Sequence, residues 1–165
     1  MTDDTNLVIR LATTEDMAEV MKLAISASEE NGFLSANPAR LAKEIWPALC
    51  QDHGLCAVIG PPSGAIEGLV LLRIGEMWYS DQIVVEEKAV YVYPEFRSAK
   101  GGRARRLCEY SKHVAEELGL PLLIGILSNA RTQGKVKLYQ RMFGEPAGAF
   151  WLIGATTGGH KVVGT

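Results

Sequence analysis

Hydrophobic and polar positions in this chain of 165 residues alternate between the period of a strand and the period of a helix. Leu7–Ala12 has the pattern of a short strand. Thr13, followed three residues later by Asp16, is a capping-box signal for a helix start, and apolar residues then recur at helical spacing towards Asn31. The start of the chain therefore predicts a strand followed by an amphipathic helix.

The next segment predicts a second helix and then a hairpin. Asn37 is a good helix cap and Pro38 suits the first helical position, while Pro47 is expected to bend or interrupt the helix. Residues 54–59 and 65–74 read as two strands, because a Pro-Pro-Ser-Gly turn separates two apolar runs.

The second half of the chain predicts alternating strands and helices. Residues 81–93 form a strand rich in Val and Tyr, and residues 102–118 form an amphipathic helix. The continuous apolar run at 121–126 is typical of a strand covered on both faces. Since one helix connects these two strands, we expect them to be parallel neighbours. A short helix at 135–143 and a final strand at 149–155 complete the pattern.

Composition indicates one globular domain over residues 1–165, with 47% hydrophobic and 22% charged residues. A formal net charge of -2 argues against nucleic acid or an anionic membrane as a partner. The three cysteines and three histidines follow no metal-ligand spacing, so we predict no metal. Without an apolar run of ~20 residues or a signal-peptide pattern, a soluble, cytoplasmic protein is expected.

The join between residues 90 and 104 carries the strongest functional signal. A strand ends at a proline corner, and a basic, glycine-containing turn leads into the helix. A helix start presents unpaired N–H groups and a partial positive charge, and it therefore binds anions. Gly101 and Gly102 permit close approach of the backbone, while Arg97, Lys100 and Arg103 add charge. The turn is thus a candidate diphosphate site, although a solvated turn with no ligand gives the same pattern.

The order of elements and this turn resemble the GNAT superfamily of N-acetyltransferases over roughly Val8 to Ile153. The family's turn reads Arg or Gln, two residues, Gly, one residue, then Gly or Ala, and residues 97–102 here read Arg-Ser-Ala-Lys-Gly-Gly. Lys100 stands in place of the family's first glycine. The resemblance implies an α/β (α+β) fold: a mixed, mostly antiparallel sheet of six to seven strands, a splayed parallel central pair and about four helices.

The resemblance also implies acetyl-coenzyme A as the acetyl donor. Pantetheine would pair with the exposed strand backbone, the pyrophosphate would bind the turn, and an asparagine after the fifth strand would contact the coenzyme, with Thr132 as a competing candidate. The implied coenzyme-binding residues are Val90, Tyr91, Val92, Arg97, Ser98, Ala99, Lys100, Gly101, Gly102, Arg103, Ala104 and Asn129.

Two residues are candidates for the proton transfers of acetyl transfer to a primary amine. Because an amine with a pKa near 10 is mostly protonated at neutral pH, a base or a water chain must remove its proton. Glu86 is the preferred base, with Glu87 and water left open, and a solvated charge pair is the alternative interpretation. Tyr139 resembles the family's tyrosine that protonates the departing thiolate, although a half-buried helical aromatic is the plainer interpretation.

The acceptor is not identified by the sequence. A small-molecule or protein amine is expected, bound by the first two helices and the loops near residues 32–34 and 77–79. Direct attack in a ternary complex is preferred, because no cysteine has a recognisable base partner. The alternative is a non-catalytic domain that binds acyl-coenzyme A or coenzyme A as a sensor or docking module. Whether the chain forms a homodimer is left open.

Overall fold

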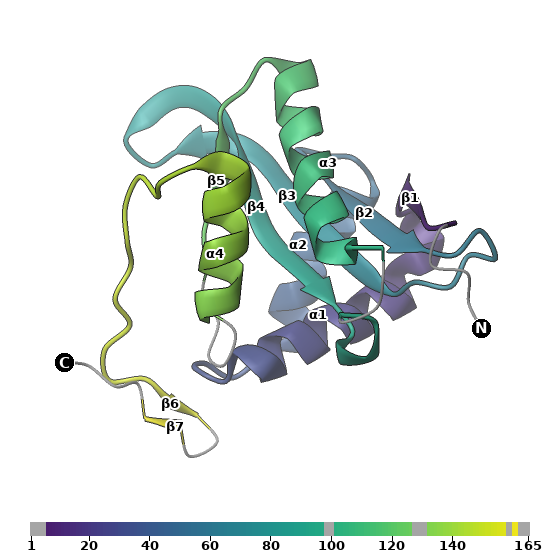
Figure 1. Cartoon of the computed structure of the whole chain (residues 1–165), viewed down its shortest axis with the longest axis horizontal. Coiled ribbons are helices and arrows are strands. Elements are labelled where there is room, and N and C mark those ends of the chain that lie inside the picture. Colours follow the sequence, from purple (N-terminus) through teal and green to yellow (C-terminus); the bar gives the residue numbers. More distant parts are fainter. Residues whose placement is uncertain (1–5, 98–100, 127–131, 158–159, 162–165) are drawn as a thin grey trace.

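The computed structural model describes residues 6–97, 101–126, 132–157 and 160–161, and within them one mixed sheet forms the centre of the molecule (Figure 1). Its strands lie in the order β1-β2-β3-β4-β5, and every neighbouring pair is antiparallel except β4 with β5. The strands are β1 (Val8–Leu11), β2 (Gly54–Gly60), β3 (Gly68–Met77), β4 (Ser80–Val92) and β5 (Leu122–Ile124). A separate short hairpin joins β6 (Thr156–Thr157) to β7 (His160–Lys161).

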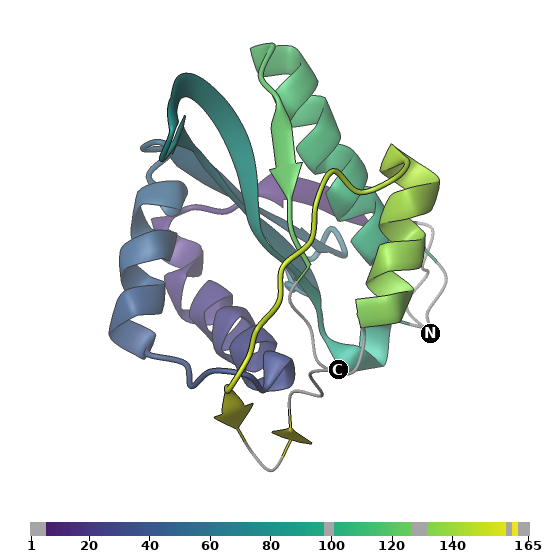
Figure 2. The ribbon, with the colours of Figure 1, turned by 90° about the vertical axis from the view of Figure 1, so that its left-hand side faces the viewer.

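Helices cover both faces of this sheet (Figure 2). One face carries α1 (Met17–Asn31) and α2 (Pro38–Leu49), and the other carries α3 (Arg103–Leu118), with α4 (Thr132–Phe143) beside it. Short 3₁₀ turns precede α1 and follow β4. The mixed, mostly antiparallel fold with a parallel pair, predicted from the sequence, is therefore confirmed.

The helix boundaries follow from capping chemistry. Thr13 and Asp16 form the predicted capping box, and the N–H of Arg40 donates to the Asn37 side chain at 3.2 Å. The expected interruption at Pro47 is not seen, because α2 continues to Leu49. Pro47 lies in the last turn of α2, so its missing N–H removes a single bond of the helical ladder.

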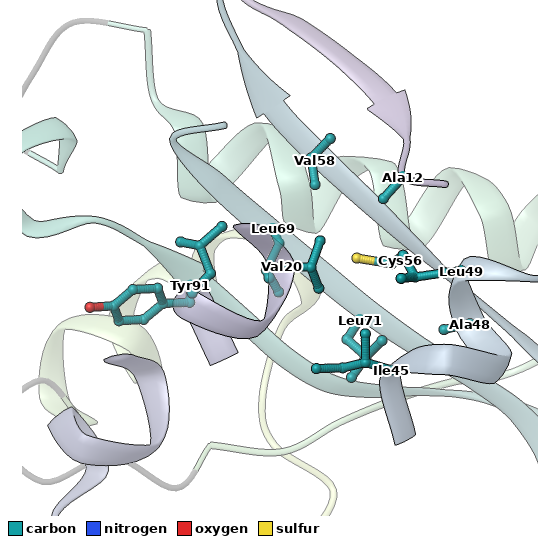
Figure 3. Packing of buried hydrophobic residues seen from close by; sticks show 11 residues of the cluster. Ala12, Val20, Ile45, Ala48, Leu49, Cys56, Val58, Leu69, Leu71 and Tyr91 are labelled. Carbon is teal, nitrogen blue, oxygen red and sulfur yellow. The ribbon is translucent and has the colours of Figure 1, made fainter. Parts of the chain in front are cut away.

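Two apolar clusters hold the helices to the sheet. Alternate residues of β2 face opposite clusters, with Cys56 and Val58 towards α1 and α2, and Ala57 and Ile59 towards α3. Figure 3 shows the cluster beneath α1 and α2, which contains Ala12, Val20, Leu23, Ile45, Ala48, Leu49, Cys56, Val58, Leu69, Leu71 and Tyr91. The central strands are thus covered on both sides and form a rigid platform for β4.

The sheet differs from the prediction at its far edge. The described sheet has five strands rather than six to seven, and the parallel pair lies at its edge instead of its centre. The strand predicted at 149–155 is not formed; Phe150, Trp151 and Ile153 are 88%, 81% and 83% exposed. A strand is stable only when it has a partner strand and a buried face. The apolar pattern of this segment does not indicate whether either is present.

Helices long and apolar enough to cross a bilayer are absent from the described part of the chain.

Candidate active site

β4 pairs with β3 along nearly its whole length but with β5 over only three residues. Val85, Glu86 and Glu87 have partners in both strands, whereas Ala89–Val92 pair with β3 and have no partner in the described part of β5. A register shift between β3 and β4 falls at this point and leaves Lys88 without an opposite residue. Such a bulge strengthens the twist of the strand and turns it away from its neighbour. The backbone edge of Val90–Val92 therefore diverges from β5.

Two cavities flank this diverging edge. The first, of about 300 Å³, lies between Val90–Val92, the start of α3 and the inner side of α4. The second, of about 500 Å³, lies between β4, β5, the end of α1 and residues 150–152. Both cavities are lined by Val90, Tyr91, Tyr139, Lys135 and Glu30. The Tyr139 side chain therefore stands where the two spaces adjoin.

The start of α3 borders the first cavity and has the backbone that the sequence predicts for an anion site. Gly101 and Gly102 have φ angles of 114° and 55°, which lie in the left-handed region that favours glycine. The helix begins at Arg103 and directs the positive end of its dipole towards Gly102. Gly102, Arg103 and Ala104 line the cavity, while Ser98, Ala99 and Lys100 lie outside the described residues.

The two described arginines of the turn contact protein carboxylates. Arg97 donates to the Val92 carbonyl at 2.7 Å and forms an ion pair with Glu30 at the end of α1. Arg103 is 3% exposed and forms an ion pair with buried Glu67, its Nε lying 2.6 Å from Glu67 Oε2. The side chain of Arg103 thus ties the start of α3 to Glu67.

Tyr139 makes the central polar contact of the site. Its phenol donates to Glu87 Oε1 at 2.9 Å, and the Ser111 hydroxyl lies 3.2 Å from Glu87 Oε2. Burial, followed by the charge of Glu87, raises the pKa of Tyr139 well above its usual range. Burial also raises the pKa of Glu87, against the opposing effects of Tyr139, Ser111 and Lys135. A neutral phenol and a carboxyl with weakened acidity therefore share one hydrogen bond.

Glu86 has the opposite environment to Glu87. Its carboxylate lies 3.0 Å from Lys88 Nζ and 3.4 Å from Arg73 Nη1, and its side chain is 28% exposed. It lines the second cavity but is not part of the Tyr139 cluster. Glu86, the base preferred from the sequence, and Glu87 both line the second cavity, so the alternation of strand residues does not separate the two glutamates here.

The sequence analysis did not connect Glu87 to Tyr139, although one signal was present. Val85 lies two residues before Glu87 in β4 and is fully buried. The strand period of two therefore places Glu87 on a buried face, where a carboxyl needs polar partners. Ser111 in α3 and Tyr139 in α4 supply them, and only the packing of both helices brings them to this point.

Two other predictions concern the loop before α4 and a metal. Asn129 lies outside the described residues, and Thr132 is the first residue of α4. Over the ranges that the structure describes, no group of three His, Cys, Asp or Glu residues is arranged to hold a metal ion. Cys108 of α3 is buried and lies beside Tyr139 of α4. Burial raises the pKa of the Cys108 thiol to about 12.

No protein-family model matches the chain, and no curated protein matches it. Solved acetyltransferase structures do match. AAC(6')-Iy in complex with the bisubstrate analogue CoA-S-monomethyl-acetylneamine has a TM-score of 0.68 at 18% identity, with 89% of this chain and 96% of that chain covered. A possible acetyltransferase from Clostridium difficile 630 has a TM-score of 0.69 at 15% identity, with 89% and 96% covered.

A third match is the ribosomal-protein-alanine N-acetyltransferase from Brucella melitensis biovar Abortus 2308, with a TM-score of 0.65 at 18% identity and coverage of 89% of this chain and 97% of that chain. The similarity extends over nearly the whole of each protein. The chain therefore has the fold of the GNAT acetyltransferases.

Proposed function

We propose that the chain is an N-acetyltransferase that moves an acetyl group from acetyl-coenzyme A to a primary amine by direct attack in a ternary complex. The observation that carries this proposal is the edge of β4 at Val90–Val92, which has no partner on the β5 side among the described residues and lies beside two cavities that share Tyr139. A two-substrate reaction needs this arrangement, with one space for each substrate and a proton donor between them.

The first cavity is the proposed donor site. The N–H and C=O groups of Val90–Val92 pair with the amides of pantetheine as an added strand does. The start of α3 from Gly101 to Ala104 holds the pyrophosphate through backbone N–H groups and the helix dipole. Arg97 lies at the same end of the cavity, with its guanidinium charge paired to Glu30. Further contacts from Ser98–Lys100 and Asn129 remain predictions.

The second cavity is the proposed acceptor site. The reaction there needs two proton transfers by side chains, one from the amine and one to the departing sulfur. Glu86 takes a proton from the ammonium group, and the neutral amine then attacks the thioester carbonyl. The nitrogen of the tetrahedral intermediate gives its second surplus proton to water. As the tetrahedral intermediate collapses, the C–S bond breaks and its electron pair passes to sulfur. The Tyr139 phenol gives its proton to that sulfur, which yields coenzyme A as a thiol.

The experiment combines donor binding with turnover. Titration calorimetry measures the Kd for acetyl-coenzyme A, and thiol release is followed over a panel of small amines, amino-terminal peptides and aminoglycosides. We expect Tyr139→Phe to lower kcat by about 10²-fold or more while the Kd for acetyl-coenzyme A stays the same. Tyr110→Phe is the matched control, because Tyr110 packs in the apolar cluster beneath α3, away from both cavities.

The outcomes separate the alternatives. Donor binding without thiol release over the whole panel favours a coenzyme A sensor or docking domain. No donor binding overturns the proposal altogether. If Tyr139→Phe leaves kcat unchanged, the protein is still an acetyltransferase, but Tyr139 is not its proton donor.

A further inference from the structure

The proposed reaction leaves one buried titratable group unused. Glu87 is 6% exposed, contacts Tyr139 of α4 and Ser111 of α3, and is among the residues that line the second cavity. Burying a carboxyl away from water is costly unless its oxygens find hydrogen-bond partners. The two hydroxyls of Tyr139 and Ser111 fill this role, one on each oxygen. This pairing sets the direction in which the phenol of Tyr139 can give its proton.

The Tyr139–Glu87 contact allows two directions of donation. When Glu87 is a carboxylate, both of its oxygens are acceptors, so the single phenol proton points towards Glu87 at 2.9 Å. A carboxylic acid with its proton on Oε2 donates to Ser111, and Oε1 still accepts from the phenol. A carboxylic acid with its proton on Oε1 instead donates to the phenol oxygen across the same 2.9 Å, and the phenol proton then points away from Glu87. This last form leaves Tyr139 free to donate to sulfur.

Ser111 allows both arrangements without movement of a heavy atom. Its hydroxyl lies 3.2 Å from Glu87 Oε2 and 3.2 Å from the Leu107 carbonyl. The hydroxyl can therefore donate to either acceptor as Glu87 gains or loses its proton, and no buried oxygen is left unsatisfied. The cluster is built to accept a change of one proton.

The groups that face Glu87 act on its pKa in opposite directions. Tyr139 and Lys135 face it from α4, and Ser111 and Cys108 face it from α3. Donation by the hydroxyls and the charge of Lys135 favour the carboxylate, but burial outweighs them and raises the pKa of Glu87. Burial also raises the pKa values of Tyr139 and Cys108, which keeps both neutral. Glu87 is thus the most acidic group in the cluster, with an acidity weaker than that of a carboxyl in water.

We propose that Glu87 is the positioning residue of the acid step, a carboxylic acid that directs the Tyr139 proton towards sulfur and then replaces it. This inference rests on the proposed acetyl transfer. As the C–S bond breaks, the phenol proton passes to the thiolate and the Glu87 proton passes to the phenol oxygen. Glu87 is left as a carboxylate and regains one proton from water before the next turnover. One proton is released overall, because the ammonium group loses two protons on becoming an amide and sulfur keeps one.

The test compares kcat against pH in the wild type and in Glu87→Gln. Gln is neutral and of the same shape but cannot supply a proton. We expect wild-type kcat to fall as pH rises through the raised pKa of Glu87, and the variant to lack that limb. Its kcat should be lower by about tenfold to 10²-fold, the lower range of general acid–base effects. The matched control is Glu76→Gln, the same substitution at an exposed position of β3, which should behave as the wild type.

A second measurement needs neither turnover nor an acceptor. At neutral pH the wild type should show the infrared C=O band of a protonated carboxylic acid, which Glu87→Gln abolishes and Glu76→Gln retains. If Glu87→Gln does not fold, a proton inventory of wild-type kcat in mixtures of H₂O and D₂O takes its place, and a curved plot with two protons in flight is expected.

The outcomes distinguish this inference from the proposed function. If the wild type releases no thiol with any amine, the acetyl transfer fails. If it turns over while Glu87→Gln keeps the wild-type kcat and pH profile, the role of Glu87 alone is overturned. Absence of the infrared band, or a linear proton inventory, overturns it equally.

Discussion

Glu67 and Glu87 are two buried glutamates that contact the same helix and receive opposite partners from it. They are 4% and 6% exposed. Glu67 meets the guanidinium of Arg103 at the first residue of α3, whereas Glu87 meets the hydroxyl of Ser111 in the middle of that helix. One contact joins two opposite charges, and the other joins a carboxyl to neutral hydroxyls of α3 and α4.

The difference shows that the partner, and not burial alone, decides what a buried carboxyl can do. An ion pair keeps its protons fixed, because a change in either partner leaves a charge in a medium of low dielectric constant. A carboxyl among hydroxyls can gain or lose a proton while every hydrogen bond persists. The Glu67 contact is therefore suited to fixing the start of α3 beside the donor cavity, and the Glu87 contact to proton transfer.

The largest predicted effect on stability is at Glu67. Glu67→Gln removes the carboxylate from a guanidinium that is 3% exposed, so we expect a loss of about 3–5 kcal/mol in the free energy of unfolding. Urea denaturation at neutral pH measures it. The same substitution at Glu87 removes no ion-pair partner and should cost about 1 kcal/mol or less. Equal losses at the two positions would remove the distinction between them.

The next effect is on the pH dependence of stability. The ordinary carboxyl pKa given for Glu87 is 4.5, and burial raises it in the folded protein. The unfolded chain then loses its proton at lower pH than the folded protein does. The contribution of Glu87 is thus fully present below pH 4.5 and declines as pH rises towards the folded pKa, by at most about 1.4 kcal/mol per pH unit.

Urea denaturation at a series of pH values, in the wild type and in Glu87→Gln, isolates this contribution. The difference between the two free energies of unfolding should change across the interval above pH 4.5 and become constant at higher pH. Asp16 should affect stability with the opposite pH dependence. Its hydrogen bond with Arg10 lowers its pKa from the ordinary value of 3.8 to about 2. The contribution of Asp16 to the free energy of unfolding is therefore present above pH 3.8 and is lost as pH falls towards 2. A constant difference between wild type and variant would show that Glu87 titrates normally.

Most of the fold was predictable because its signals are local. The capping box at Thr13 and Asp16, the cap at Asn37 and the glycine pair before α3 each mark a boundary within a few residues of sequence. The parallel neighbours β4 and β5 followed from a single helical crossover. Phe150 and Trp151 misled the prediction of a last strand, because apolar content does not reveal whether a pairing edge is within reach.

The candidate site was predictable in its parts and not in its connections. Tyr139 was named from its place in the last helix and Glu86 from its strand, but the contact of Tyr139 with Glu87 joins residues far apart in sequence. Predicting it requires the packing of α3 and α4 against β4. The bulge opposite Lys88, which turns the strand edge towards the cavities, depends on register and leaves no local signal.

The smallest expected effect on stability is at Glu86, the neighbour of Glu87 on the opposite face of β4. Its carboxylate is partly exposed and pairs with Lys88 and Arg73 at 3.0 and 3.4 Å, so Glu86→Gln should change the free energy of unfolding by no more than about 0.5 kcal/mol. Its activity should nevertheless fall, because the amine loses its proposed base. We expect kcat/KM to drop by about 10²-fold at neutral pH and to recover as pH approaches the pKa of the amine.

Recovery at high pH is the decisive reading of that experiment, since it identifies the missing step as removal of the amine proton. Glu87→Gln should show no such rise, because it lacks the titrating carboxyl and its kcat should stay low and independent of pH over this range. The same substitution at two adjacent glutamates would then give one pH profile that rises and one that stays flat. If both variants recover together, the two carboxyls serve the same proton transfer, and a division of base and acid roles between the two faces of β4 is wrong.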